Sequence, residues 1–501
     1  MLRGKLPVAS VRAMLPFLEP TMHATSGCSA GRLAGALLAI IIAGLAPGTV
    51  ARGETRLAVK RSEPCLSASQ IVDLASSLAS PSDDSDSYPA AVRLLLGNTA
   101  SQSTQGLDAF EENRSFVYAL GRRSLHSVRR LVILKPSTLV VEDQILPGSE
   151  GDAGPCLYSA SRPEVTGRRV RIAVGNRQLF WETLAPRGSR YHISARATGK
   201  PTPEEYLLEP AIQGSQSGSR TLTVLYVNGR RGQATPPPYL DLAQAASQWK
   251  LTVSAGKRVF RLMLPPPVDG AGEIAISDAA GKTLMASRPL PLGILPHGPE
   301  GNRLLDRWDA DYRGQDPPAW DIGRPADELQ RIVKEGTVRA CRVVDLGCGS
   351  GTDAIFLASH GFRVTAIDIS PTALRQAAEK ARKAGVSVRW VLADVLALPH
   401  LEPFDFVYDR GCYHNVRDQN LAGYIEAVRR LSHPGTRFLL LSARRDEQAA
   451  ADAPGVTEEE LRFDFHSLFD VESLREIKLE TNRTNVSPPG WSALMLRNTN
   501  P

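Results

Sequence analysis

Hydrophobic and polar positions change their period near residue 296 of this 501-residue chain. Before that point, short runs rich in Val, Ile and Leu are separated by Gly, Pro and Ser, a pattern typical of β-strands joined by turns. The clearest runs lie at Val128–Leu134, Leu139–Leu146, Val170–Val174, Leu179–Leu184, Leu222–Val227, Leu251–Val253, Val259–Leu264 and Ile274–Asp278. Such strands bury their apolar faces by packing sheet on sheet, so we expect a β-rich, sandwich-like domain over residues 115–295.

Beyond residue 296, apolar strands alternate with helical stretches. The predicted strands are Val343–Asp345, Phe362–Asp368, Val388–Leu392, Phe404–Asp409, Arg437–Ser442, Glu472–Leu479 and Ser492–Leu496. Helices are predicted between them, with Ser370 and Pro371 opening one that Gly385 closes. This alternation predicts a multidomain chain whose residues 296–501 form an α/β, Rossmann-like sheet of seven strands.

A glycine-rich turn follows the first of these strands. Residues 345–351 read Asp-Leu-Gly-Cys-Gly-Ser-Gly, which places glycines at Gly347, Gly349 and Gly351. Glycines between a strand and a helix let backbone N–H groups approach a ligand closely. A dinucleotide oxidoreductase is the alternative, but the third glycine of its G-x-G-x-x-G pattern falls on Thr352.

This D-x-G-x-G-x-G run resembles motif I of the class I S-adenosylmethionine (SAM) methyltransferases, and the resemblance extends over about 195 residues. It implies SAM as the cofactor. The acids Asp345, Asp368 and Asp394 end or follow successive strands, and ligands of open α/β sheets bind at those carboxyl ends. The residues assigned to the cofactor are Trp308, Asp345, Gly347, Gly349, Gly351, Asp368, Ile369, Asp394 and Val395.

Two further stretches resemble the thiopurine and small-thiol methyltransferases. Trp320-Asp-Ile-Gly-Arg-Pro325 is similar to the lid that covers the cofactor in those families. Asp409-Arg-Gly-Cys412 is similar to their acceptor-side loop. The resemblance therefore implies a small-molecule acceptor, a thiol or a related soft nucleophile.

The residues expected around the acceptor come from these two stretches and their surroundings. Asp409 and His414 are the predicted catalytic residues, either of which would serve as general base for an amine or hydroxyl acceptor. Substrate binding is assigned to Trp320, Arg324, Arg410 and Tyr413. A thiol near its free pKa is already partly ionised at neutral pH, so a thiol acceptor needs no strong base.

Charge is distributed unevenly along the chain. Residues 296–501 contain 26 Lys and Arg against 30 Asp and Glu, so the predicted methyltransferase region has a net charge of −4. Because the whole chain has a net charge of +6, the remainder has +10. An acidic domain argues against a nucleic-acid substrate. The basic front is suited to an acidic glycan or simply to a solvated surface.

Residues 1–56 have the pattern of a signal peptide or membrane anchor. Basic residues precede the apolar run Leu33–Leu45, which is short for a membrane span and typical of a signal peptide. The chain is therefore expected to be exported or membrane-associated, and cytoplasmic if the N-terminus is mis-called. A true start at Met22 would leave a signal peptide of conventional length. Residues 57–114 are expected to be a linker with one helix over Ser67–Leu78.

The six cysteines do not form a disulfide framework or a metal site by spacing. Cys65 and Cys156 can pair if the chain is exported, whereas Cys341 and Cys348 flank the glycine motif. Without CxxC or a spaced His and Cys cluster, no metal site is expected.

The segment Arg129–Asp143 is loosely similar to the β-sandwich of heparinase II/III-like polysaccharide lyases. That resemblance covers residues 115–285 and implies glycan or polyanion binding, with a spacer as the structural alternative. An exported glycan-binding protein with a vestigial methyltransferase domain is therefore the competing hypothesis for the whole chain.

Overall fold

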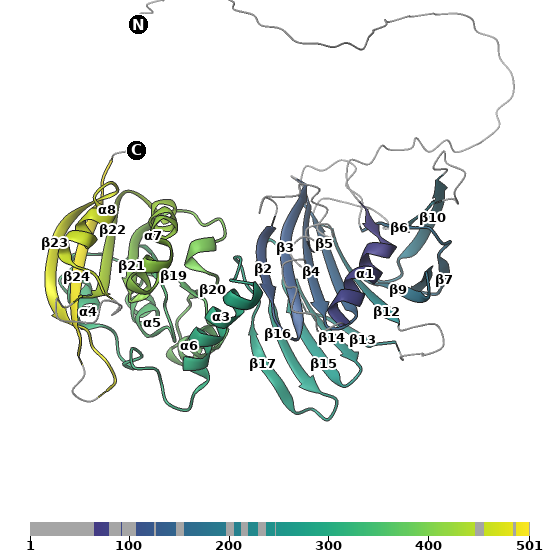
Figure 1. The fold of residues 1–501 in the computed structure, drawn as a ribbon, viewed down its shortest axis with the longest axis horizontal. Helices are drawn as coiled ribbons and strands as arrows, with labels where there is room; N and C mark the ends of the chain where they lie inside the picture. Colours follow the sequence, from purple (N-terminus) through teal and green to yellow (C-terminus); the bar gives the residue numbers. More distant parts are fainter. Residues whose placement is uncertain are drawn as a thin grey trace, which may run out of the picture. The chain divides into compact units, whose positions relative to one another are not determined.

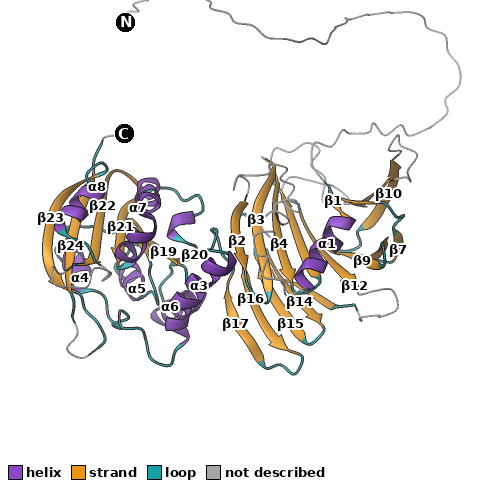
Figure 2. Cartoon of the chain, viewed as in Figure 1, coloured by secondary structure: helices purple, strands orange, loops and turns teal. Residues whose placement is uncertain are grey.

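The computed structural model describes residues 65–79, 92, 107–124, 127–146, 155–196, 205–211, 219–228, 237–245, 247–445, 455–483 and 487–499. The predicted targeting segment 1–56, with its apolar run at 33–45, lies outside these residues and stays a prediction. In the part of the chain that the structure describes, no helix has the length and apolarity needed to cross a membrane. Figures 1 and 2 show the arrangement of the helices and strands.

The C-terminal region is built on one seven-stranded sheet in the order β20-β19-β18-β21-β22-β24-β23. The first five strands run parallel, and the last two pair antiparallel. These strands are β18 (Arg342–Leu346), β19 (Arg363–Asp368), β20 (Arg389–Leu392), β21 (Phe404–Arg410), β22 (Ser432–Ala443), β23 (Phe469–Lys478) and β24 (Pro489–Arg497). The strand order reverses between β18 and β21, where open α/β sheets bind their ligands.

Helices cover both faces of this sheet because successive strand residues face opposite sides. The helices are α3 (Gly298–Arg313), α4 (Asp327–Lys334), α5 (Thr352–Ser359), α6 (Pro371–Ala384), α7 (Cys412–Leu431) and α8 (Glu458–Phe465). Val344 shares a core with α7 and α8, whereas its neighbour Val343 shares a different core with α4 and α5. The predicted α/β, seven-stranded fold of this region is confirmed.

Helix α7 begins within Asp409–Cys412, the stretch that resembles an acceptor-side loop in the sequence. The helix begins at Cys412, directly after β21. The carboxylate of Asp409 accepts hydrogen bonds from the backbone N–H groups of Cys412 and Tyr413, at 2.9 and 3.0 Å. This side-chain cap satisfies the first free N–H groups of the helix and allows it to start early.

The region before residue 290 is rich in β-sheet, and its two largest sheets are antiparallel. An eight-stranded sheet has the order β2-β3-β4-β5-β12-β9-β8-β7, and a five-stranded sheet runs from β13 to β17 in sequence order. The first comprises β2 (Leu107–Glu112), β3 (Phe116–Ser124), β4 (Ser127–Leu134), β5 (Thr138–Ile145), β7 (Glu164–Thr166), β8 (Arg169–Val174), β9 (Arg177–Ala185) and β12 (Arg220–Asn228). The second comprises β13 (Tyr239–Ala245), β14 (Gln248–Ala255), β15 (Arg258–Leu264), β16 (Glu273–Asp278) and β17 (Thr283–Pro289).

The eight-stranded sheet is buried on both faces at its centre. One face shares a core with β14, β15 and β16 of the five-stranded sheet. The other face packs against helix α1 (Ala68–Ala79) and a four-stranded sheet. That sheet contains β1 (Leu66–Ser67), β6 (Leu157–Ser159), β10 (Arg190–Arg196) and β11 (Glu205–Ala211). Strand β2 and helix α1 both lie inside the predicted linker 57–114. The linker is expected to hold one helix over Ser67–Leu78, which α1 matches, and the apolar residues of both elements belong to these cores.

Two adjacent arginines in β4 are buried between these layers. Arg129 pairs across the sheet with Asp143, through contacts of 2.6 and 2.8 Å. Arg130 pairs with Glu142, its neighbour in the same strand register. Consecutive strand residues face opposite sides, so each buried guanidinium has a carboxylate on its own face. A slip of one residue would separate these buried charges, so the two pairs favour a single register.

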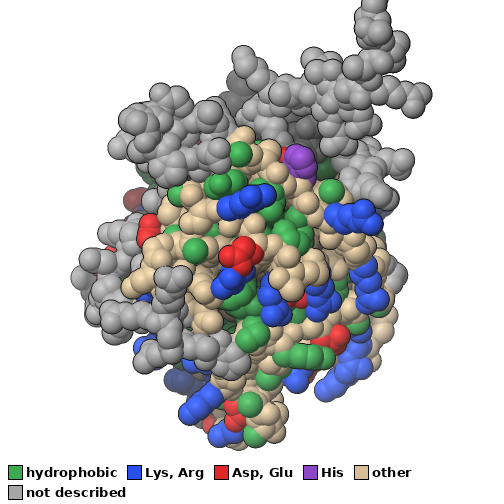
Figure 3. All heavy atoms as spheres, turned by 90° about the vertical axis from the view of Figure 1, so that its right-hand side faces the viewer, with side chains coloured by type: hydrophobic (Ala, Val, Ile, Leu, Met, Phe, Trp, Pro, Cys, Tyr) green, Lys and Arg blue, Asp and Glu red, His purple; other side chains and the backbone are tan. Residues whose placement is uncertain are grey.

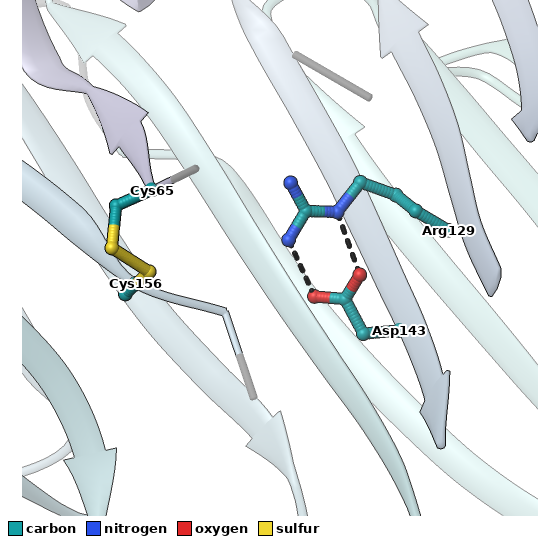
Figure 4. The surroundings of a disulfide bond; sticks show 4 residues. All are labelled: Cys65, Arg129, Asp143 and Cys156. Carbon is teal, nitrogen blue, oxygen red and sulfur yellow. Dashed lines mark hydrogen bonds and ion pairs between the residues drawn. A yellow bond between two sulfur atoms is a disulfide. The ribbon is translucent and has the colours of Figure 1, made fainter. Parts of the chain in front are cut away.

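A disulfide joins the N-terminal end of this region to the sheets. Cys65 and Cys156 are bonded, as considered for an exported chain, beside the Arg129–Asp143 pair (Figure 4). Leu66 N–H donates to the carbonyl of Cys156 at 2.9 Å, so the covalent link continues into the β1–β6 pairing.

The connector after β17 is extended, as its prolines predict, and is hydrogen-bonded along its length. Leu292 N–H donates to Leu392 O at 3.0 Å, and Ile294 N–H donates to Ala397 O at 3.2 Å. On its other side, Phe110 N–H donates to Gly293 O. The connector is therefore hydrogen-bonded to residues of both neighbouring sheets or their loops. The domain boundary expected near residue 296 stays a prediction.

Loss of the disulfide is expected to destabilise the sheets around β1 and β6. The two cysteines are 91 residues apart. A disulfide that closes a loop of that length restricts the unfolded chain and so stabilises the folded state by roughly 4 kcal/mol. We predict that the double variant, with Cys65→Ser and Cys156→Ser, unfolds at a lower urea concentration than the wild type. Circular dichroism of the full chain measures the midpoint of unfolding. Cys341→Ser is the matched control, because Cys341 forms no disulfide. An unchanged midpoint in the double variant would contradict the prediction.

Candidate functional site

The glycine turn after β18 is shaped by left-handed residues that have no room for a side chain. Gly347 has φ +68°, and a Cβ added there would lie 2.8 Å from Cys412 Cβ. Gly349 has φ +53°, and its Cβ would lie 2.5 Å from the hydroxyl oxygen of Tyr312. Both positions therefore require glycine.

Gly351 has a different role from the predicted one. A Cβ at this position would meet the rings of Trp390 and the methyl of Ala377, at 2.6 to 2.7 Å. The third glycine thus allows the loop to pack on its own domain, and it does not line the cavity described below.

Two aspartates at the carboxyl ends of β19 and β20 face the same cavity. Asp368 accepts hydrogen bonds from Gly349 N–H at 2.7 Å and from Ser370 N–H at 2.8 Å, one on each oxygen. Burial raises the pKa of Asp368 to about 6, although these backbone donors oppose the shift. Asp394 accepts from Leu396 N–H at 2.9 Å, and burial raises its pKa as well. Each carboxylate keeps lone pairs for a ligand's hydroxyl or amino groups.

Asp345 is the penultimate residue of β18 and is buried with one oxygen unsatisfied. Its Oδ2 has no hydrogen-bond partner among the described residues. Burial, together with the nearby carboxylates of Asp353, Asp409 and Asp368, raises its pKa well above the usual value. Asp345 and Gly349 line a small pocket beside the main cavity. A buried acceptor without a partner is costly, so this oxygen is a fitting contact for a donor on a ligand.

The main cavity has a volume of about 720 Å³ and opens at the carboxyl edge of the sheet. Nine residues predicted for the site line it: Trp308, Trp320, Gly347, Asp368, Ile369, Asp394, Val395, Arg410 and His414. Asp345, Gly349 and Arg324 line the adjoining pocket, whereas Gly351, Asp409 and Tyr413 line neither.

An aromatic cluster borders the cavity on the side of helix α3. The indole N–H of Trp320 donates to the hydroxyl of Tyr312 at 2.8 Å. The rings of Trp308 and Trp320 meet edge to face, with centroids 5.8 Å apart. We use the term lid for residues 317–325, which carry Trp320. The predicted lid thus lies at the cavity, and it is linked to the glycine turn because Asp321 accepts from the hydroxyl of Ser350.

His414 lines the cavity, but its protonation does not fit the predicted role of general base. Its Nδ1 accepts a hydrogen bond from Ala443 N–H at 3.2 Å. The neutral ring must then carry its proton on Nε2, which leaves no free lone pair for a substrate proton. Burial lowers the pKa of His414 to about 4, so the ring is neutral above that pH. His414 is therefore suited to donating a hydrogen bond.

Asp409 and Tyr413 line neither cavity and are bound to groups within the fold, so their predicted catalytic and substrate roles stay predictions. Asp409 is fully buried and accepts from the hydroxyl of Tyr424 at 2.5 Å as well as capping α7. Burial raises the pKa of Asp409 to about 7. The hydroxyl of Tyr413 donates to Asp464 at 2.5 Å, beneath the helix. Sequence position alone did not distinguish these side chains from the cavity-facing residues on the same loop.

Arg410 and Arg324 are bound to the protein itself. Arg410 donates from Nη1 to the carbonyl of Trp320 at 3.0 Å, and from Nη2 to the carbonyl of Glu480 at 3.1 Å. Arg324 is half-exposed and forms ion pairs with Asp327 and Glu480. The two guanidinium groups predicted to bind an acceptor thus hold the lid and its surroundings.

Sequence reasoning missed several residues that line the cavity. They come from α3, the start of α7 and the β23–β24 connection: Arg307, Asp311, Tyr312, Cys412, Asn415, Gln419, Glu480 and Thr481. Tyr312 lies four residues after Trp308, and this helical spacing could have assigned both to one face. The residues of the β23–β24 connection have no sequence signal, because only the tertiary fold brings them to the lid. Within the described ranges, no three His, Cys, Asp or Glu side chains lie together in a way that could hold a metal ion.

The sheet order, the glycine turn and the acids at successive strand ends define a Rossmann-like domain that binds a nucleoside at its switch point. A model described as "Methyltransferase domain" matches residues 343–435. An uncharacterized methyltransferase of Schizosaccharomyces pombe is 30% identical over 99 residues, which cover 20% of this chain and 68% of that protein. The chain belongs to the methyltransferase family, and its cofactor is S-adenosylmethionine.

Other relatives act on different acceptors. A 2-heptyl-1-hydroxyquinolin-4(1H)-one methyltransferase of Mycobacteroides abscessus is 29% identical over 146 residues, 28% of this chain and 64% of that protein. A probable thiol methyltransferase of Arabidopsis thaliana is 24% identical over 174 residues, 34% of this chain and 74% of that protein. The chain spans 36% to 64% of the length of the first three curated relatives it matches.

A solved structure concerns the conversion of a disulfide bond into a thioacetal group during echinomycin biosynthesis. It is 29% identical, covers 40% of this chain and 93% of that chain, and has a TM-score of 0.36. The family match at residues 343–435 lies outside the segment that resembles heparinase II/III-like lyases, so that resemblance stays a prediction.

The residues at the carboxyl edge fit this cofactor. Asp368 and Asp394 offer carboxylate acceptors for hydroxyl and amino groups, and Ile369 and Val395 add apolar surface beside them. The unsatisfied Oδ2 of Asp345 suits an ammonium donor. The glycine turn leaves its backbone uncovered by side chains at Gly347 and Gly349.

Asp368→Asn is expected to weaken binding of S-adenosylhomocysteine at pH 7.5 by roughly 10-fold to 100-fold, because hydrogen bonds to a charged group are worth about 1.5–3 kcal/mol. Burial raises the Asp368 pKa to about 6, so the ionised acceptor is lost as the pH falls below that value. Calorimetry on the full chain should therefore show wild-type affinity falling from pH 7.5 to pH 5, with a flatter response in the variant.

The exposed residue Asp470 provides the matched control, Asp470→Asn, which should bind as the wild type does. Burial also raises the pKa of Asp409 to about 7. Its protonation changes binding equally in the wild type, Asp368→Asn and Asp470→Asn, so it does not affect the comparison. Equal affinities of Asp368→Asn and the wild type would show that this carboxylate is not part of the nucleoside site.

Proposed function

We propose that this protein transfers a methyl group from S-adenosylmethionine to a small-molecule thiol or a related soft nucleophile. The observation that carries the proposal concerns the part of the cavity away from Asp368 and Asp394, where the acceptor would lie. Its walls are apolar, and none of its described side chains is placed to take a proton from the acceptor. The apolar walls are formed by Leu304, Leu396, Val416, Leu441 and Leu479. This arrangement suits an acceptor that brings its own ionisable nucleophile.

The titratable side chains around the cavity support this choice of acceptor. His414 carries its proton on Nε2 and stays neutral above about pH 4. Glu480 is bound to the backbone N–H of Asp327 and to Arg324. Asp311 is exposed to solvent on α3. Asp368 and Asp394 lie on the nucleoside side of the cavity.

The bound cofactor supplies a methyl group on a sulfonium, which is already activated for in-line displacement. The chain's own residues then contribute mainly position and the exclusion of water. Asp345, Asp368 and Asp394 hold the cofactor's polar groups, and Trp308, Tyr312 and Trp320 close the site from one side. His414 Nε2–H is available to donate to the acceptor. The relationship to a probable thiol methyltransferase supports the same class of acceptor.

An assay of methyl transfer by mass spectrometry tests the proposal on the full chain. The panel comprises an aryl thiol, an alkyl thiol, an N-hydroxyquinolone and a primary amine. We expect kcat/KM for the aryl thiol to exceed that for the amine by about 100-fold or more, because the thiol is ionised without a protein base. The pH at which kcat/KM levels off should follow the pKa of each thiol.

Asp368→Asn serves as the control for reaction outside the nucleoside site, and at subsaturating S-adenosylmethionine its rate should fall by the roughly 10-fold to 100-fold expected for its affinity. A common pH inflection for all acceptors would instead point to a protein base and oppose the thiol proposal. Efficient transfer to the hydroxyquinolone or the amine alone would identify a different acceptor class for the same methyltransferase.

A second function, polyanion binding by the β-rich region, is favoured by an arginine-rich face on strands β7 to β9 and the start of β10. Residues 162–192 contain seven arginines and only two acids, Glu164 and Glu182. Val170 and Ile172 face the core, so Arg169 and Arg171 face outward on the same strand. Figure 3 shows Lys and Arg side chains gathered on this side of the molecule among few acidic ones.

The two acids do not neutralise this face. Glu182 is shared by Arg168 and Arg169, at 2.5 and 3.2 Å, and Glu164 pairs with Arg171. The other four arginines have no acidic partner among the described residues: Arg162, Arg177, Arg187 and Arg190. Guanidinium groups that reach the surface without an acidic partner favour an acidic polysaccharide, through bidentate contacts with carboxylate or sulfate groups.

Substitution of Arg162, Arg177, Arg187 and Arg190 by Gln is expected to abolish retention on a sulfated polysaccharide column at 0.15 M salt. The wild type should bind there and elute at higher salt, because exposed charge contacts are screened. The matched control replaces four Lys and Arg outside this face, namely Lys250, Lys257, Arg258 and Lys282, and removes the same charge. If both variants elute at the same salt concentration, net charge alone explains the retention and the proposed face is wrong. If the wild type binds only anionic vesicles or nucleic acid, the face binds those ligands and not a polysaccharide.

A further inference from the structure

Few of the backbone carbonyl groups of the lid are hydrogen-bonded within the lid itself. It runs between α3 and α4 without regular secondary structure and begins with Pro317 and Pro318, which have no backbone N–H. Within the lid, Asp321 N–H donates to Pro318 O at 2.9 Å. The remaining carbonyl groups need donors from elsewhere in the chain or from water.

One residue of the β23–β24 connection supplies most of those donors. Asn482 donates from its backbone N–H to Ala319 O at 2.9 Å. Its side-chain Nδ2 lies 2.8 Å from Pro318 O, 3.1 Å from Asp321 O and 3.2 Å from Pro317 O. A single asparagine thus contacts four carbonyl groups in five consecutive residues.

Glu480 and Arg410 extend the same attachment to both sides of Asn482. The carboxylate of Glu480 accepts from Asp327 N–H at 2.9 Å, at the first turn of α4. The backbone carbonyl of Glu480 accepts from Arg410, which also reaches the carbonyl of Trp320. The β23–β24 connection, the exit of β21 and the lid are therefore joined over the cavity, which Trp320, Glu480 and Thr481 line together.

We propose that Asn482 is a positioning residue that latches the lid closed over the cavity, and that release of this latch controls the exchange of the bound nucleoside. The latch consists of Asn482 and Glu480, with Arg410 as the bridge to the lid. Because Asn482 is exposed to solvent, its bonds compete with water and can open without disrupting a core. The inference rests on the proposed function only for the identity of the nucleoside.

Asn482→Asp is the informative substitution, since it preserves size and the backbone N–H but replaces the Nδ2 donors by a carboxylate facing three carbonyl oxygens. Asn482→Ala removes the donors without that repulsion. We expect amide hydrogen exchange over residues 319–329, measured without ligand on the full chain, to accelerate roughly tenfold in Asn482→Asp and less in Asn482→Ala. Exchange in β18 and β22 should remain unchanged, which reports that both variants are folded.

Nucleoside exchange is then followed by stopped-flow dissociation of S-adenosylhomocysteine. The dissociation rate constant should rise about 5-fold to 10-fold in Asn482→Asp, with a smaller change in the association rate constant. Asn176→Asp is the matched control, because Asn176 lies in the exposed turn between β8 and β9 and undergoes the same change.

Wild-type exchange over residues 319–329 in both Asn482 variants would overturn the latch. Faster exchange of the lid with an unchanged dissociation rate constant would overturn its control of the nucleoside. If the wild type binds no S-adenosylhomocysteine, the proposed methyltransferase function fails, while hydrogen exchange without ligand still decides whether Asn482 holds the lid.

Discussion

The C-terminal site depends on one electrostatic constraint, the convergence of carboxylates where neighbouring parallel strands end. Asp345, Asp368 and Asp409 end or nearly end β18, β19 and β21, which are adjacent in the sheet. Burial raises the pKa of each, and the pKa of Asp345 is raised further by the other two. Such a cluster persists only when backbone N–H groups or ligand donors compensate the buried charge.

The three aspartates are compensated in different ways, and this difference assigns their roles. Asp409 uses the free N–H groups of α7 together with the hydroxyl of Tyr424, so it is consumed by the fold. Asp368 uses one N–H on each oxygen and keeps capacity for a ligand. Asp345 keeps an unsatisfied oxygen beside the glycine turn. A cationic, hydroxylated nucleoside is the kind of ligand that completes this edge.

The β-rich region solves a similar problem of buried charge within its own layers. Arg129 and Arg130 are nearly inaccessible, yet each meets a carboxylate because β4 and β5 pair in one register. The cost of separating such charges makes a shifted register unfavourable. The disulfide at Cys65 and the packing of α1 then close the outer face of the same sheet. Charge is therefore buried in pairs inside this region, while among the described residues several arginines without an acidic partner lie at its surface.

The sequence by itself determined the elements and the nucleoside side of the site. Strand and helix periods, the turn at Gly347 and Gly349, and the acids Asp368 and Asp394 are local signals, because each depends on neighbouring residues. The acceptor side was decided only by the tertiary structure. The direction of Asp409, the tautomer of His414 and the attachment of Asn482 to the lid depend on groups 3 to 165 residues away in the chain. A side chain's partners, and hence its charge and chemistry, are set by what the fold places beside it.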